Sequence, residues 1–354
     1  MIRLAISVIA IVLGVHAALW GEAMTDKSAS QRFCQAFRDR GWVTAFATST
    51  RRGSVALIDS ITVQRGAEAR GIYKAGPDDI EIGEPVVSPD GSQIAFIKTS
   101  RMGDQIYTRV MQMSSTGSAL RAVSELRAPA GAIRGIAVPS PLAWSGDMKT
   151  IAYVGEIKNS VSANRPRQAR DRFAVHNLAL IDVDSGQAKE IRIFERRASA
   201  GPFLPTQAWD PTGRRLVYAY DGQIFVLDIT TRSEERIARG EVATWSPDGD
   251  LIAVREHDDS ASGMEGDYVT VAASAPHERA LLLANPRPRL SLRPTMRRGF
   301  FGEANWSPDG RFIIVRRYRT FREGSSWHVF DRTTGDVDTL SGCSVGTSIG
   351  GKVW

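Results

Sequence analysis

Short apolar runs recur along this chain, and a similar polar phrase precedes each of them. The runs read "SQIAFIK", "MKTIAYVG", "RRLVYAY", "DLIAVRE" and "RFIIVRR", and each is typical of a strand in length and apolar content. The phrases are Val87-Ser88-Pro89-Asp90-Gly91, Trp144-Ser145-Gly146-Asp147, Trp209-Asp210-Pro211-Thr212-Gly213, Trp245-Ser246-Pro247-Asp248-Gly249 and Trp306-Ser307-Pro308-Asp309-Gly310. Internal repetition of this kind indicates an array of similar structural units.

The recurring phrase has the composition of a tight turn. Proline presets φ for the second position of a type I turn, aspartate is tolerated at the third, and glycine supplies the left-handed residue that closes a hairpin with a bulge. Because such a turn needs the same residue types in every copy, we interpret these aspartates as turn residues rather than catalytic carboxylates. Each copy therefore predicts a hairpin between an inner strand and a more buried one.

Strands and turns account for nearly all of the chain after residue 41. Three predicted strands, "WVTAFATS", "GSVALIDS" and "ARGIYKAG", precede the first phrase. Each later unit has the order phrase, buried strand, loop, second strand, turn and third strand. Asp184-Ser185-Gly186 and Asp221-Gly222 are the predicted turns of two further hairpins.

The spacing of the phrases defines the size of one unit. Aligned on the serine or its aspartate replacement, the copies start at 88, 145, 210, 246 and 307, at intervals of 57, 65, 36 and 61 residues. The shortest interval fits one minimal four-stranded unit, and the longer ones fit single units with insertions. Five phrase units and the three N-terminal strands make six, and the tail "VGTSIGGKVW" supplies the strand that closes the ring.

These repeats resemble a known family. A W-S-P-D-G phrase before an "IAF"-like strand, followed by a strand such as "QIFVLD", resembles the TolB-type, WD40-like β-propeller repeat, from about residue 42 to the end. The resemblance implies an all-β fold: a six-bladed β-propeller of four-stranded antiparallel blades, closed by pairing of the N- and C-terminal strands. The α/β domain that precedes the propeller in TolB has no counterpart here, and similar repeats also occur in prolyl-oligopeptidase-like enzymes.

The N-terminal residues predict export. Arg3 and the apolar stretch "LAISVIAIVLGV" have the pattern of a signal peptide, expected over residues 1–23, with an uncleaved anchor as the alternative. Residues 24–41 predict a short helical segment with Ser30 as N-cap, and residues 42–354 the propeller. No later stretch could span a membrane, so we expect a periplasmic or secreted protein, and a monomer.

The chain contains two cysteines, Cys34 and Cys343, near opposite ends of the predicted mature protein. An even number of cysteines in an exported protein suggests a disulfide, and the two ends of a ring-shaped fold must meet. We therefore predict a Cys34–Cys343 bond, with two unrelated buried thiols as the alternative.

Catalytic and metal-binding patterns are weak. Gly342-Cys343-Ser344-Val345-Gly346 and Gly346-Thr347-Ser348-Ile349-Gly350 match the serine-hydrolase elbow, but no histidine follows them and no helix can. His257-Asp258-Asp259 is one acidic cluster beside a histidine, too small for a ligand set. We expect no catalytic residue, no metal and no cofactor.

Two arginine-rich insertions are the predicted recognition sites. Loops that project from a rigid scaffold often carry binding residues, and arginine is common in interface anchors. A formal net charge of +6 in an exported protein favours an acidic protein partner or an anionic envelope component, and not nucleic acid. The candidate residues are Arg165, Arg167, Arg170 and Arg172 in one insertion and Arg287, Arg289, Arg293, Arg297 and Arg298 in the other.

The sequence therefore predicts an exported, non-catalytic propeller that acts as a binding scaffold. Two alternatives remain open. One is a lactonase- or hydrolase-like propeller enzyme with a site in its central channel, where Glu303 and Asn305 are polar exceptions among apolar or small residues. The other is a regulatory propeller of peptidase lineage without its catalytic half.

Overall fold

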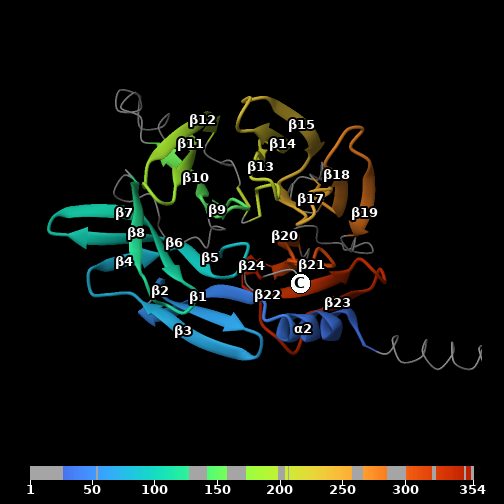
Figure 1. Cartoon of the computed structure of the whole chain (residues 1–354), viewed down its shortest axis with the longest axis horizontal. Helices are drawn as coiled ribbons and strands as arrows, with labels where there is room; N and C mark the ends of the chain where they lie inside the picture. Colours follow the sequence, from blue (N-terminus) through green and yellow to red (C-terminus); the bar gives the residue numbers. More distant parts are fainter. Residues whose placement is uncertain are drawn as a thin grey trace, which may run out of the picture.

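Six small β-sheets stand around a central axis in the computed structural model (Figure 1). The structure describes residues 27–52, 55–126, 142–157, 173–197, 204–205, 207–256, 266–284, 300–320, 324–346 and 348–351. The chain passes through the six sheets in order, so that the first and last strands meet in one sheet. The six-bladed propeller predicted from the repeats is confirmed.

Each blade is antiparallel, with its first strand nearest the axis. Blade 1 comprises β24 (Ser348–Gly350), β1 (Val43–Arg52), β2 (Val55–Arg65) and β3 (Glu68–Lys74), and blade 2 comprises β4 (Asp79–Ile82), β5 (Val86–Val87), β6 (Gln93–Met102), β7 (Gln105–Ser114) and β8 (Arg121–Leu126). Blade 3 comprises β9 (Leu142–Trp144), β10 (Thr150–Ile157), β11 (Phe173–Asp182) and β12 (Ala188–Arg197), and blade 4 comprises β13 (Arg215–Tyr220), β14 (Gln223–Asp228) and β15 (Glu234–Arg239). Blade 5 comprises β16 (Val242–Trp245), β17 (Leu251–Arg255), β18 (Tyr268–Ala272) and β19 (Arg279–Leu283), and blade 6 comprises β20 (Phe300–Trp306), β21 (Phe312–Thr320), β22 (Gly324–Asp331) and β23 (Val337–Thr339).

The ring closes through the C-terminal strand, as predicted. β24 pairs antiparallel with β1, with Ser348 opposite Ala45 and Gly350 opposite Val43. Blade 4 differs from the others because its inner strand is reduced to a single bridge between Trp209 and Leu216. This difference leaves room at the axis for the segment that precedes blade 4.

The recurring phrase forms a similar hydrogen-bonded turn in blades 2 to 6. In four copies the serine hydroxyl donates to the aspartate two residues later and accepts the backbone N–H five residues later. In the remaining copy Asp210 replaces the serine and accepts the N–H of Arg215 at 3.0 Å. These bonds confirm that the aspartates serve the turn. The hydroxyl–carboxylate distances are 2.7 Å for Ser88–Asp90, 2.6 Å for Ser145–Asp147, 2.5 Å for Ser246–Asp248 and 2.5 Å for Ser307–Asp309.

Glycine ends the turn for two separate reasons. Gly249 has φ +81°, which other residues adopt only at a cost. A Cβ atom added there would also lie 3.0 Å from Cγ and Cδ of Pro211, in the turn of the preceding blade. The turns of neighbouring blades therefore interlock around the axis.

Tryptophans tie the inner strands together. The indole Nε1 of Trp144, in blade 3, donates to Val86 O in blade 2 at 3.3 Å, and Trp209 donates to Ala143 O at 3.1 Å. Trp306 repeats this bond to Thr244 O at 3.2 Å. Each contact joins one blade to the blade before it, so in these three copies the tryptophan of the phrase adds a specific inter-blade bond to its buried area.

The N-terminal helix covers the outside of blade 6 (Figure 1). Helix α2 (Ala29–Asp39) begins after Ser28, whose hydroxyl accepts the backbone N–H of Gln31. The prediction of Ser30 as N-cap is therefore wrong: Ser30 lies inside the helix and donates to Ser341 O at 3.0 Å. That hydroxyl is used for tertiary attachment, which the capping pattern alone does not reveal.

The predicted disulfide is present. Cys34, in α2, bonds to Cys343 with an S–S distance of 2.07 Å and a Cα–Cα distance of 5.7 Å. Next to it, Arg32 Nε lies 2.7 Å from Asp331 Oδ2, in blade 6. The helix thus holds the segment that leads into the closing strand β24.

Candidate functional site

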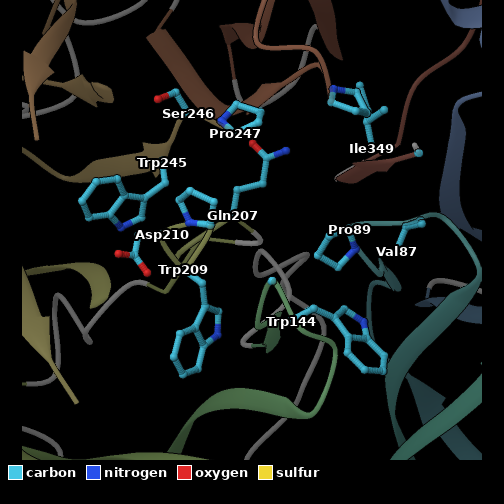
Figure 2. A pocket seen from close by; sticks show the side chains of 14 residues that line it. Val87, Pro89, Trp144, Gln207, Trp209, Asp210, Trp245, Ser246, Pro247 and Ile349 are labelled. Atoms are coloured by element: carbon cyan, nitrogen blue, oxygen red, sulfur yellow. The ribbon is translucent and has the colours of Figure 1, made fainter. Parts of the chain in front are cut away.

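A cavity of about 240 Å³ opens at the centre of the face that carries the turns. Figure 2 shows side chains from around the ring surrounding this opening, with Pro89 and Pro247 among them. All six blades contribute lining residues: the five phrases each bring their third residue to the axis, and blade 1 contributes Ile349 and Gly351. The lining is mainly proline and tryptophan, and the tryptophan rings are themselves buried.

Gln207 occupies part of the channel behind these prolines. Its amide Nε2 donates to Trp306 O at 3.0 Å, and its Oε1 accepts the Trp306 N–H at 2.7 Å. Oε1 also accepts the Thr244 hydroxyl at 3.2 Å. A residue that precedes blade 4 is thereby joined to the inner strands of blades 5 and 6. No sequence signal singled out Gln207, because its partners lie 37 and 99 residues away.

A group of polar side chains outside the cavity lining joins blades 6 and 2. Tyr318, from β21, donates to the Glu303 carboxylate at 3.3 Å, and Glu84 precedes β5 of blade 2. Burial and the nearby Glu303 carboxylate raise the pKa of Glu84, against the Ala47 hydrogen bond and the Arg316 charge. Burial and the Glu303 charge likewise raise the pKa of Tyr318 to about 12. Of these residues the sequence had indicated only Glu303.

Asn305, the other polar exception, is buried in β20 of blade 6. The two serine-hydrolase-like matches lie in and beside the closing strand. Ser348 belongs to β24, and the Gly346 N–H donates to the Thr44 hydroxyl at 2.7 Å. A Cβ atom on Gly346 would lie 1.9 Å from Ala45 O, so this glycine permits the close approach of two strands. These residues serve ring closure.

The two arginine-rich segments lie outside the described residues, as do the predicted signal peptide and His257-Asp258-Asp259. Nothing in the structure tests the nine candidate arginines. The described strands beside the segments do show where they attach. The strand that precedes a turn phrase runs toward the turn face, and the strand that follows the phrase runs away from it. β10 and β11, and likewise β19 and β20, are therefore joined at the opposite face, at Ile157 and Phe173 and at Leu283 and Phe300.

The described part of the chain contains neither a metal-binding cluster nor a membrane-spanning helix. Those residues include no group of three or more His, Cys, Asp or Glu side chains placed to hold a metal ion. Helix α2, with 11 residues, is too short and too polar to cross a bilayer, and no described helix is long and apolar enough to do so.

No family model matches this sequence, and no curated protein matches it either. Solved structures do resemble it. A TolB-like protein of Agrobacterium tumefaciens is 16% identical over 87% of this chain and 92% of its own, with a TM-score of 0.50. A nidogen/laminin complex contains a chain that is 12% identical over 87% of this chain and 97% of its own, with a TM-score of 0.51.

An oligogalacturonate lyase in complex with manganese is 10% identical over 84% of this chain and 78% of its own, with a TM-score of 0.50. At these identities the likeness concerns the fold alone, a six-bladed β-propeller that resembles the TolB-like protein. The neighbours include both enzymes and non-enzymes, so the fold by itself is compatible with either.

Proposed function

We propose that this protein is an exported, non-catalytic propeller that binds an acidic protein segment or an anionic component of the cell envelope through its two arginine-rich segments. The observation that carries the proposal is topological. The strands beside both segments are joined at the same face of the ring, so both can contribute to one surface. The Cys34–Cys343 disulfide supports export, because such bonds persist in oxidising compartments.

A binding titration against envelope fractions tests this proposal. Changing Arg165, Arg167, Arg289 and Arg293 to Glu should weaken binding at least tenfold at low ionic strength, because each change reverses a charge. The matched control changes four exposed cations on outer strands to Glu. Unchanged affinity in the test variant, or equal loss in the control, would reject the arginine-rich segments as the binding surface. The control residues are Arg70, Lys74, Lys189 and Arg236.

The alternative is an enzyme with a site in the channel. One observation favours it: Glu84, Glu303, Tyr318 and Arg316 lie close together in blades 2 and 6, and a carboxyl group of raised pKa, such as that of Glu84, can act as a general acid. A lactonase and esterase screen, repeated with Glu303→Gln, separates the two functions. Turnover that the substitution abolishes would support the enzyme, and absence of turnover would support the binding module. A regulatory propeller of peptidase lineage would also lack turnover, and its partner would be a peptidase.

A further inference from the structure

The cavity on the turn face has features that the proposed function does not use. Its volume of about 240 Å³ lies below the roughly 300–1,000 Å³ of pockets that enclose whole small-molecule ligands. A space of this size suits one large side chain. Its walls suit an apolar one, because they are formed by proline rings and the edges of buried tryptophans.

Four carboxylates lie beside the residues that line this cavity. Asp90, Asp147, Asp248 and Asp309 each directly follow a lining residue on the turn face, in blades 2, 3, 5 and 6. Two of the four are already near arginines: Arg40 lies 2.5 Å from Asp309, and Arg332 lies 3.8 Å from Asp248.

The other two carboxylates, in neighbouring blades 2 and 3, remain available. Among the described residues, neither Asp90 nor Asp147 forms a salt bridge within 4.0 Å, although Lys149 is close enough to attract Asp147. Hydrogen bonds from Ser145 and from the Lys149 N–H lower the pKa of Asp147. Burial raises the pKa of Asp90, but hydrogen bonds from Ser88 and Ser92 outweigh it and lower this pKa. Both groups are therefore ionised at neutral pH.

We infer that this cavity binds a peptide segment in which one large apolar side chain stands between basic residues. The apolar side chain fills the space between the prolines, and the flanking cations pair with Asp90 and Asp147. Hydrogen bonds of Gln207 and the close contacts between neighbouring turns hold the cavity walls in place. This site lies on the opposite face from the strand ends that the arginine-rich segments join, and it prefers the opposite charge, so it is independent of the proposed function.

Calorimetric titration of the full chain with three capped synthetic pentapeptides tests this site. The probes are Gly-Lys-Trp-Lys-Gly, the same peptide with Ala in place of Trp, and the same peptide with Glu in place of both lysines. We expect the first to bind with a Kd of about 0.1–1 mM and the other two to bind at least about tenfold more weakly. Equal binding of the alanine probe, equal binding of the acidic probe, or absence of binding by all three would each overturn the inference.

A pair of matched variants locates the binding. The double variant Asp90→Asn and Asp147→Asn retains the oxygen that accepts the turn hydrogen bonds but removes two charges. It should weaken the binding of Gly-Lys-Trp-Lys-Gly about three- to tenfold at low ionic strength, with a smaller effect in high salt. The control, Asp104→Asn with Asp221→Asn, removes two exposed charges from the opposite face and should change affinity less than about twofold. Equal effects of the two variants would contradict this location of the site.

Discussion

Each turn is specified by side chains within a few residues of one another. The serine hydroxyl both donates to aspartate and accepts a backbone N–H, so one buried group satisfies two neighbours. Ser307 is fully buried, and an unsatisfied polar group there would cost about 1–3 kcal/mol. Because these hydrogen bonds join residues that are close in sequence, the turns could be predicted from five consecutive residues. The helix N-cap could not be predicted in this way. Ser28 and Ser30 both suit an N-cap, and tertiary contact with Ser341 decides between them.

Two glycines with similar φ angles allow the cost of backbone strain to be distinguished from the cost of a side-chain clash. Gly249 has φ +81° and Gly335 has φ +77°, but only Gly249 would bring a Cβ atom within 4 Å of a neighbour. Gly335→Ala should lower the free energy of unfolding by about 1 kcal/mol, from backbone strain alone. Gly249→Ala should lower the free energy of unfolding by at least about 1 kcal/mol more than Gly335→Ala does, because its methyl group is forced against Pro211. Urea titration measures both, and equal losses would show that the turns do not interlock.

At the scale of strands and hairpins, adjacent blades are joined by specific polar contacts as well as by apolar packing. His277, in the turn between β18 and β19 of blade 5, lies 2.9 Å from Glu235 in β15 of blade 4. Its other ring nitrogen lies 2.9 Å from Ala272 O. Both the bond to Ala272 and the bond to Glu235 raise the pKa of His277. Sequence alone could not pair these residues, because they belong to different blades.

The histidine contact makes part of the stability depend on pH. A raised folded-state pKa contributes stability that is complete below the unfolded value of about 6.5 and is lost as pH rises through the folded value. The difference in melting temperature between the native chain and His277→Asn should therefore be largest near pH 5.5 and shrink toward pH 8.5. Asparagine is chosen because it tolerates the φ of +54° at this position. A difference that grows with pH would contradict this contribution.

For the whole molecule, closure of the ring depends on two attachments of the chain ends. β24 completes blade 1, and the disulfide holds the segment before it against α2. The two cysteines are 309 residues apart, so the bond restricts a very long loop in the unfolded chain. The loop-entropy model gives such a bond on the order of 5–6 kcal/mol as an upper value.

Replacing both cysteines should therefore lower stability substantially. The variant Cys34→Ala with Cys343→Ala should unfold at a clearly lower urea concentration than the oxidised native chain, because its unfolded state regains that freedom. Reduction of the native chain should produce a similar shift and leave the variant unchanged. An oxidised chain that unfolds at the same urea concentration as the variant would show that the bond contributes no net stability.

The five phrases by themselves determined the blades, their turns and the closing strand, because each turn is encoded within five residues and the repeats recur in order. The even cysteine count and the meeting of chain ends likewise predicted the disulfide. Only the tertiary structure decided which residues meet near the axis: Gln207 with Trp306, the prolines of four phrases, and Glu84 with Glu303. Those groups come from different blades, and their distances are fixed only when six blades close into a ring.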